Sequence, residues 1–533
     1  MTSKNNAAPN RPSRALLPVI AISLMTVVSA VASFNVALPS VATDTGATQT
    51  QLTWIVDAYT VVFAGLLLLA GALGDRYGRK YLLIAGLTIY AIANVVGIIG
   101  GQDTTPEALI AIRAFTGIGA AMIMPTTLSV ITTSFEKEER AKAVGVWTGV
   151  AAGGAVLGIV GTSTLMVWFP WTCFFWLNLT FAVIGLLGAI RVVPNSRGES
   201  HPIDWFGGIL SLLGVGGLVW GIVSGPDSGW TSPEVLTPII VGVACLVAFV
   251  LFELRAKHPL LDPRVFKNQA FAAGSFSISV QFFAQFGFFF IAMQYLQFVG
   301  KLEPWQAACM LLPMPFVVIP MARISGKLSQ RFPQKILGTI GLTLFGSALL
   351  LLSTQGSTID VVRFEFSVAL LALGVGLATT PATTAITTSL PPEKQGVASA
   401  VNDVAREFGS ALGIAILGAG LNDHYRNAMK DFVKTIQIPP QVPHVVSARI
   451  MHNLNDFAVK SAGFTRISDP QSKLGNAWQV VKVFWNDLVN HALSYFAEGA
   501  AGALRIAGIT AIIGAVVVAT LAPNRKDREN LIR

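Results

Sequence analysis

One stretch of the chain, residues 53–80, constrains the fold more than any other. Residues 53–73 are long and apolar enough to cross a bilayer, which takes about 20 such residues, yet Asp57 lies near their start. Glycine, arginine and lysine residues end the apolar run at residues 74–80. An acid in hydrocarbon costs about 2.5–3.5 kcal/mol on insertion scales, so the fold must compensate Asp57.

The composition indicates a protein that crosses the membrane many times. Hydrophobic residues make up 53% of the 533 residues, charged residues only 12%, and the mean hydropathy is +0.62. So few charges cannot cover the surface of a soluble protein. The net charge of +9 comes from Lys and Arg in short turns, which is typical of cytoplasmic loops, and we expect no nucleic-acid partner.

Fourteen transmembrane helices are predicted from the apolar runs. They cover residues 15–38, 53–73, 81–100, 108–134, 142–165, 171–190, 205–224, 236–254, 271–298, 305–325, 336–355, 364–389, 396–421 and 497–522. The first run is too long for a signal-peptide core, so we expect it to be retained. Because basic turns alternate with turns almost free of Lys and Arg, both termini are predicted to be cytoplasmic.

The predicted architecture is all-α, with two pseudo-symmetric six-helix bundles and two inserted helices. The decapeptide at 71–80 recurs weakly at 326–335, and each copy closes an apolar run. The predicted segments are a cytoplasmic tail (1–14), an N-terminal bundle (15–190), the inserted helices and linkers (191–268), five helices of the C-terminal bundle (269–421), an extracellular excursion (422–496), the last helix (497–522) and a second tail (523–533). Parallel repeats place a substrate site near the midplane between the halves.

The excursion at 422–496 is predicted to contain two amphipathic helices joined by a loop at 463–477. Their apolar stripes are Val446, Ile450, Leu454 and Phe457, and then Trp478, Val481, Trp485, Leu488 and Ala492. Two interpretations stay open: the helices pack on the outer surface or lipid interface, or they form a lid over the outward mouth.

Five groups of residues together resemble a known family. They are the turn Gly71-x-Leu73-Gly74-Asp75-Arg76-Tyr77-Gly78-Arg79-Lys80; Asn35-Val36-Ala37-Leu38-Pro39; Trp54-Ile55-Val56-Asp57-Ala58-Tyr59; Arg113 with Gly117 and Gly119; and Gly396-Val397-Ala398-Ser399-Ala400-Val401-Asn402-Asp403 with Arg406, Glu407 and Gly409. The chain thereby resembles the major facilitator superfamily, in its fourteen-helix drug–proton antiporter branch. The resemblance implies a cell (inner) membrane protein that exports lipophilic or cationic small molecules by alternating access, with proton entry as the driving force.

The turn at 71–80 is expected to act as a gate. Gly71, Gly74 and Gly78 permit a sharp reversal, while Arg76, Arg79 and Lys80 hold it on the cytoplasmic side. The resemblance implies that Asp75 contacts the other half, and the helix that starts at Gly396 is the expected acceptor. The alternative is a basic turn that only fixes topology.

Three ionisable residues are predicted to carry proton coupling: Asp57, Arg113 and Glu407. Asp57 and Arg113 lie at similar depth with opposite charge, so we expect them to pair, either for coupling or as a structural ion pair. Glu407 lies about 16 Å into its helix, near the midplane, with Asp403 and Arg406 on nearby faces. We expect it to contact substrate or protons; the alternative is an Arg406–Glu407 network that only fixes packing.

Further residues are candidates for lining a substrate cavity. Gln281, Gln285 and Phe286 lie in the Phe-rich run at 271–298, and Trp147 lies on the fifth predicted helix. The alternative is that these aromatic residues face lipid or neighbouring helices. Asp403 and Glu407 complete the predicted cavity.

Two departures from the family pattern weaken the expectation of standard antiport. Ala30 stands where the first helix usually carries an acid, and Ile159 replaces the usual Pro of the antiporter motif. A competing hypothesis is therefore an uncoupled or differently coupled exporter of one endogenous metabolite or lipid. A second class is a non-transporting membrane receptor or assembly partner.

No enzyme, metal or cofactor motif stands out, and there is no phosphate-binding loop for ATP. The three cysteines have no metal-ligand spacing. We expect a small-molecule substrate, protons and membrane lipid as partners, and the oligomeric state stays open.

Overall fold

The computed structural model describes residues 13–135, 137–197, 202–329, 331–390, 395–436, 459–466 and 482–523, and every regular element in them is a helix. The all-α prediction is therefore confirmed. The N-terminal half contains α1 (Leu16–Thr45), α2 (Gln49–Tyr77), α3 (Arg79–Gly100), α4 (Pro106–Ser134), α5 (Lys137–Leu165) and α6 (Cys173–Val192). The inserted pair is α7 (Trp205–Ser228) and α8 (Pro233–Glu253).

The C-terminal half contains α9 (Gln269–Phe298), α10 (Pro304–Cys309), α11 (Pro313–Leu328), α12 (Gln334–Leu352), α13 (Val361–Thr388), α14 (Gln395–Thr435) and α18 (Trp485–Leu521). Thirteen spans in the described residues are long and apolar enough to cross a membrane, with α10 and α11 together forming one broken span, Pro304–Leu328. Helix α5, of 29 residues, brings the number of helices of spanning length to the predicted fourteen.

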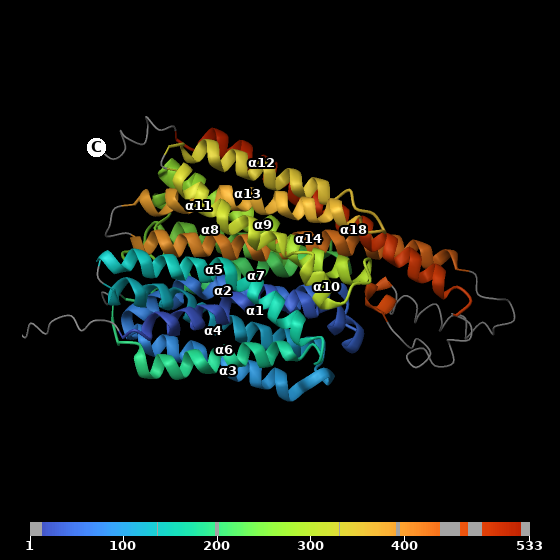
Figure 1. The fold of residues 1–533 in the computed structure, drawn as a ribbon, viewed down its shortest axis with the longest axis horizontal. Coiled ribbons are helices and arrows are strands. Elements are labelled where there is room, and N and C mark those ends of the chain that lie inside the picture. The colour runs from blue at the N-terminus through green and yellow to red at the C-terminus, as the bar shows by residue number, and fades with distance from the viewer. Residues whose placement is uncertain are drawn as a thin grey trace, which may run out of the picture.

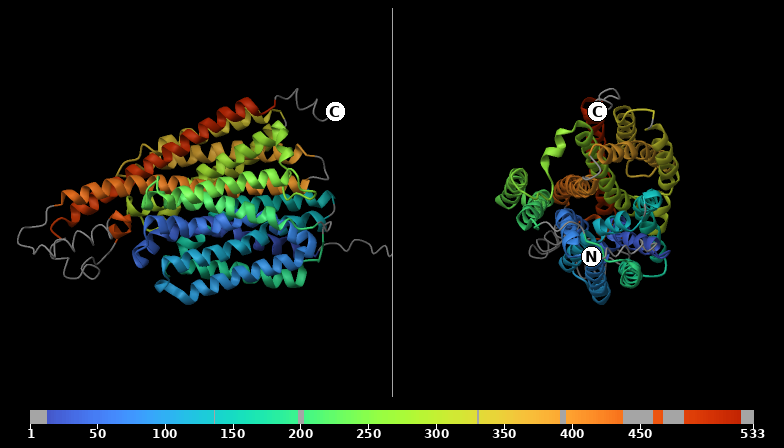
Figure 2. Two further views of the ribbon diagram at one scale, coloured as in Figure 1. Left: turned by 180° about the vertical axis from the view of Figure 1, so that it is seen from behind. Right: turned by 90° about the vertical axis from the view of Figure 1, so that its left-hand side faces the viewer.

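The two halves repeat one packing scheme, which confirms the predicted pseudo-symmetry. In the N-terminal half α1 packs on α5 and α6, while α4 packs on α2 and α3, and α3 also meets α6. In the C-terminal half α9 packs on α14 and α18, while α13 packs on α11 and α12, and α12 also meets α18. The end-on view in Figure 2 shows the blue half and the yellow-to-red half side by side, with the green pair α7 and α8 on the flank.

The seam between the halves is formed chiefly by α2 and α14, and α1 meets α9. Helix α7 packs against both α2 and α14, so the inserted pair lies along this seam rather than apart from it. Small side chains of α14, Ala411 and Ala415, lie with Val61 of α2 and Val215 of α7 in one buried apolar cluster.

The last two helices are longer than the spans predicted for them. Helix α14 continues fourteen residues past 421 to Thr435, and α18 begins at Trp485 rather than near 497. Both helices therefore project beyond the rest of the bundle, as Figure 1 shows at the right. Trp485, Leu488 and Ala492 of the second predicted stripe lie on α18 itself. Trp478, Val481 and the whole first stripe lie outside the described residues.

Residues 459–466 lie between the two halves at this end. The short helix η5 (Ala462–Arg466) replaces the start of the predicted loop and touches α1, α9 and α18. Arg466 donates to the carbonyl oxygens of Gln297 and Leu302 at 3.0 and 3.1 Å. The backbone N–H of Gln49 donates to the Lys460 carbonyl at 2.9 Å. This segment thus holds α2 of one half and α9 of the other.

The hydrogen bonds that join α1–α6 to the C-terminal half, among the residues described, all lie at the outer end. Gln297 donates to the Val36 carbonyl at 3.0 Å, and Gln49 donates to the Gln294 side chain at 3.1 Å. Asn422 donates to Thr50 Oγ1 at 2.8 Å. Polar contacts therefore join the two halves at the end where α14 and α18 project, which is the end predicted to face outward.

Close backbone approach between α9 and α14 generates a first prediction. A methyl group on Gly413 would collide with the carbonyl oxygen of Phe283, whereas one on Gly420 would lie 3.9 Å from its nearest neighbour, Ile506. We expect Gly413→Ala to destabilise the protein by about 1–3 kcal/mol, because the helices must separate. Unfolding in detergent measures this, with Gly420→Ala as the matched control. Equal stability of the two variants would contradict the packing described.

Candidate functional site

Arg113 lies inside the N-terminal half, enclosed by aromatic rings. Its guanidinium carbon is 4.4 Å from the ring centroid of Tyr59, 5.2 Å from that of Phe34 and 5.8 Å from that of Phe174. Its Nε donates to the Ile55 carbonyl at 3.0 Å, and the side chain is fully buried. Ring faces attract a desolvated cation by about 2 kcal/mol or more. The charge of Arg113 is thus stabilised mainly by α1, α2 and α6.

The expected Asp57–Arg113 ion pair is not formed. Asp57 is fully buried, and neither of its carboxylate oxygens has a hydrogen-bond partner. The reason is rotation about the helix axis. Tyr59, which faces Arg113, is two residues and therefore about 200° away from Asp57 on α2. Equal depth in the membrane did not bring the two charges together.

Asp57 instead lies on the face of α2 that meets α14. One turn before it, Thr53 packs on Gly418 of α14, with Thr53 Oγ1 3.1 Å from where a Gly418 methyl would lie. One turn after it, Val61 clusters with Ala411 and Ala415. Because the two helices run antiparallel, these contacts place Asp57 opposite the 411–418 stretch of α14. The carboxyl group is therefore in the seam between the halves.

Glu407 lies nearer the N-terminus of α14, about seven residues or roughly 10 Å from the level of Asp57. Its side chain is 7% exposed, and Oε2 has no hydrogen-bond partner. It interacts electrostatically with Asp403 and Arg406 of its own helix. Arg406 in turn lies over the ring of Phe282, 5.3 Å from its centroid. The structure brings these predicted residues together in one cluster of one cation and two acids.

Tyr59 connects this cluster to Arg113. Its ring contacts the guanidinium, its hydroxyl donates to the Val27 carbonyl at 3.1 Å, and it interacts electrostatically with both Arg113 and Glu407. Arg113 and Glu407, which belong to opposite halves, thus both interact with one buried phenol. Tyr59 is the last residue of one quoted motif but was given no role from the sequence, Phe34 adjoins another motif, and Phe174 was not singled out.

The predicted cavity-lining residues divide into two sets. Phe286 stacks on Phe282, with centroids 5.6 Å apart, and Gln285 beside them is half-buried, so both lie near Arg406. Gln281 points into the C-terminal half, where it donates to Ser277 and accepts from Thr379 at 2.7 Å. Trp147 donates to Thr127 at 3.0 Å within the N-terminal half. A role for any of them in substrate contact stays a prediction.

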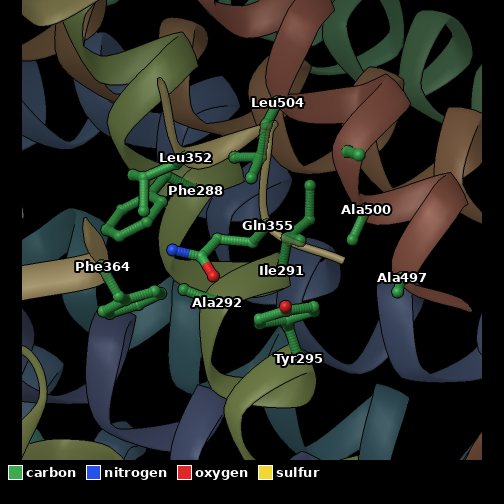
Figure 3. Close-up of a pocket in the computed structure, with 11 residues that line it drawn as sticks. Phe288, Ile291, Ala292, Tyr295, Leu352, Gln355, Phe364, Ala497, Ala500 and Leu504 are labelled. Carbon is green, nitrogen blue, oxygen red and sulfur yellow. The ribbon is translucent and has the colours of Figure 1, made fainter. Parts of the chain in front are cut away.

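A pocket appears elsewhere, at the outer end of the C-terminal half. Figure 3 shows it lined by Phe288, Tyr295 and Gln355 together with alanines of α18. The Tyr295 hydroxyl donates to the Gly356 carbonyl at 2.6 Å, and Gln355 exchanges hydrogen bonds with the backbone of Asp360. Its lining polar groups are therefore already paired, and none of the predicted site residues lies there.

The turn at 71–80 is fastened to its own half in this structure. Asp75 accepts from Arg79 at 2.8 Å, the Arg79 N–H donates to the Ser196 carbonyl, and Lys80 donates to the Ile190 carbonyl. Gly78 has φ 115°, which L side chains rarely adopt, so the reversal requires glycine here. Side chains at the start of α14, around Gly396, lie outside the described residues, so the expected gate contact stays a prediction.

No group of three or more His, Cys, Asp or Glu side chains gathers as a candidate metal site in the described part of the chain.

Comparison with known proteins was made by sequence and by structure. The profile of the Major Facilitator Superfamily matches residues 20–414. The puromycin resistance protein pur8 of Streptomyces alboniger is 32% identical over 75% of this chain and 80% of its own length. The multidrug efflux pump LfrA of Mycolicibacterium smegmatis is 31% identical (77% and 80%), and the methyl viologen resistance protein SmvA of Salmonella typhimurium is 30% identical (76% and 80%).

Solved structures share the fold. A bacterial homologue of the human lysosomal transporter Spinster, inward-facing and unoccupied, aligns with a TM-score of 0.60 at 15% identity, over 94% of this chain and 95% of that one. A peptide transporter POT in complex with sulfate aligns with a TM-score of 0.60 at 14% identity, over 98% and 100%.

The aromatic enclosure of Arg113 makes a second prediction. In a double-mutant cycle, Arg113→Gln and Tyr59→Leu should couple by more than about 0.5 kcal/mol in unfolding free energy, because their side chains touch. Arg113→Gln and Asp57→Asn should be additive within about 0.5 kcal/mol, because they do not pair. If Arg113 and Asp57 instead coupled more strongly than Arg113 and Tyr59, the ion pair expected from their equal depth would be present after all.

Proposed function

The chain belongs to the major facilitator superfamily, and on that premise we propose that it exports lipophilic or cationic small molecules in exchange for protons by alternating access. It is a multi-pass membrane transporter and not an enzyme, with relatives of about 30% identity that confer drug and antibiotic resistance. We further propose that it resides in the inner membrane with both termini in the cytoplasm, as its basic turns indicate.

One observation carries the proposal: Glu407 and Asp57 are buried carboxyl groups in the seam with unpaired oxygen atoms. A carboxyl group of this kind can bind either a proton or a cationic substrate, and the two then compete. Arg113 is held by rings and a carbonyl, so we assign it a tuning role through Tyr59 rather than direct proton exchange. Asp403 and Arg406 set the charge around Glu407. Gln285 and Phe286 would line the substrate cavity with side chains that can adapt to different substrates.

Alternating access requires that the outer closure open. The contacts of Thr50, Gln49 and Gln297 across the seam, together with the 459–466 segment, must then break. The position of that segment between α1, α9 and α18 favours the lid interpretation of the excursion. We propose that the turn at 71–80, Asp75 above all, forms the complementary closure with the Gly396 helix in the outward-open state.

The uncoupled exporter stays the second candidate, because two observations favour it. Ala30 is fully buried and supplies no acid to the first helix, and Ile159 is buried in α5 without the kink that Pro would give. An exporter of one metabolite or lipid would move it without a pH response, and a receptor would not move it at all.

Everted membrane vesicles with an acidic lumen separate these candidates. Added methyl viologen or puromycin should release the stored pH gradient if the chain exchanges protons for substrate. Accumulation of the compound with the pH gradient unchanged would favour uncoupled export. Neither response across a panel of dyes and antibiotics would favour the receptor.

Substitution at the seam gives a third prediction. Glu407→Gln should lower the substrate-induced pH response by about tenfold or more, because the amide can neither release a proton nor attract a cation. Asp57→Asn should lower it as well. Glu365→Gln, the same change at an exposed position of α13, is the control and should have no effect. Intact export in both seam variants would remove these residues from the mechanism.

A reversible disulfide cross-link across the seam gives a fourth prediction. In a chain freed of its three cysteines, Thr53→Cys with Gly418→Cys should form a disulfide, since the side chain of Thr53 comes within 3.2 Å of the Gly418 methyl position. Oxidation should stop transport and reduction should restore it. Gly338→Cys with Val518→Cys has the same spacing inside one half, 3.2 Å, and should transport in either redox state. Undiminished transport by the oxidised Thr53–Gly418 pair would exclude rocking at the outer seam.

A further inference from the structure

Two acids meet at the cytoplasmic end of the inserted helices, away from the seam residues discussed above. Asp204 caps α7, and its Oδ1 accepts from the Gly207 N–H at 2.8 Å. Glu253 is the last residue of α8 and only 1% exposed, and its Oε2 accepts from the Leu261 N–H at 3.4 Å. One oxygen of each carboxyl group is therefore held by a backbone donor.

The second oxygen of each group borders the same small space. A methyl group on Gly207 would lie 2.5 Å from Asp204 Oδ2 and 2.6 Å from Glu253 Oε1. Both oxygens are closed off from solvent, and neither has a donor among the described residues. The two side chains nevertheless interact directly with each other. Two ionised carboxylates held like this would repel each other with no cation between them.

One proton satisfies both oxygens at once. A neutral carboxyl group donates to a neighbouring carboxylate in a charge-assisted hydrogen bond, and such pairs titrate as a unit. We propose that Asp204 and Glu253 form a proton-binding pair that shares one proton at neutral pH. The shared proton fastens the cytoplasmic ends of α7 and α8 to each other, while the Leu261 N–H holds the linker into the C-terminal half on the other oxygen of Glu253.

The groups shown to act on Glu253, within the described chain, are Asp204 and the backbone N–H groups of Leu260 and Leu261. Charged residues on the neighbouring elements have other contacts or lie elsewhere on them. Arg264 donates to the Leu254 carbonyl, and Asp262 accepts from the Arg264 N–H. Other charged residues of these elements are Arg255, Lys257, His258 and Lys267 on the linker, Asp75 and Arg76 on α2, and Asp403, Arg406 and Glu407 on α14. Asp57 on α2, Asp227 on α7, Glu234 on α8 and the charged residues of α14 from Asp423 onward lie toward the opposite ends of their helices.

The linker that the pair holds touches both halves of the transporter. Leu260 and Leu261 pack in one cluster with Leu68 of α2 and with Ala400 and Val404 of α14. Loss of the shared proton would leave two carboxylates that repel each other, Asp204 and Glu253, at the point where the two halves and the inserted pair meet. The pair is thus placed to relate cytoplasmic pH to the mobility of this junction.

Infrared difference spectroscopy of the full chain in lipid nanodiscs tests the proposal directly, because a protonated carboxyl group absorbs apart from a carboxylate. At neutral pH, Glu253→Gln and Asp204→Asn should each lose the absorption of one protonated carboxyl group relative to the unmodified protein. Both amides can still donate across the space, so the fold should persist. Glu234→Gln, an exposed glutamate on the same helix, is the control and should lose none.

Thermal unfolding gives a second, independent measurement. A group that binds its proton more tightly when folded stabilises the protein at lower pH, and this stability is lost as pH rises through its release. The unmodified protein should therefore lose stability as the pH rises from about 4.3, the value of a glutamate in the unfolded chain, to the pH at which the folded pair releases its proton, and Glu253→Gln should lose less over the same range. Gly207→Ala, whose methyl would enter the space, should also lose the effect. Gly216→Ala, whose nearest neighbour is 3.8 Å away, should keep it.

Two results would overturn the proposal. Identical protonated-carboxyl absorption in the unmodified protein and Glu253→Gln would show that the pair holds no proton. Stabilisation by sodium, potassium or magnesium that disappears in Glu253→Gln would show that a metal cation, not a proton, lies between the carboxylates. Both measurements are independent of transport, so failure of the export proposal would leave them interpretable.

Discussion

A charge in the low-dielectric interior of a membrane is stable only where nearby groups compensate it, and this requirement explains the arrangement of the buried polar residues. Arg113 is enclosed by three aromatic rings and donates to the Ile55 carbonyl, although its two terminal guanidinium nitrogens have no hydrogen-bond partner among the described residues. Glu407 and Asp57 are compensated incompletely, since oxygens of both lack partners. The first arrangement suits a fixed charge that shapes the field around it. The second suits a group whose partner, a proton or a cation, comes and goes.

The two incompletely compensated acids, Asp57 and Glu407, both lie in the seam between the halves. Asp57 and Glu407 lie on the two helices that join the halves, α2 and α14, at levels about 10 Å apart. Small residues of α14 allow α2 and α7 to approach closely, while polar contacts close the outer end. A relative rotation of the halves would therefore change the surroundings of both acids without unfolding either bundle. The inserted helices α7 and α8 pack along the same seam, so they would move with it or resist it.

Much of the fold was predictable from the sequence because the bilayer sets the length of each apolar run, and a run of about 20 residues is visible locally. The extension of α14 to Thr435 was not predictable in this way. Asp423, Arg426 and Asp431 make that stretch look like a loop, yet it continues as part of a helix that packs against α18. The candidate acids were found because ionisable residues are rare in such runs. The partners of these acids were not found, because the sequence gives the depth of a residue along its helix but not the rotation of that helix about its axis. The Asp204–Glu253 contact was not predictable from the sequence, because it forms only when α7 and α8 pack together.

The central claim is that water reaches the seam from each side in turn, and the labelling of a single cysteine at Ala415, opposite Asp57 on α14, tests it most directly. In a chain freed of its native cysteines, a membrane-impermeant thiol reagent would be applied to the outer face and, separately, to the cytoplasmic face. The account predicts reaction from both faces, with substrate changing the ratio of the two rates. Reaction from neither face, with labelling only by a lipid-soluble reagent, would show that this seam never opens to water and would contradict the account.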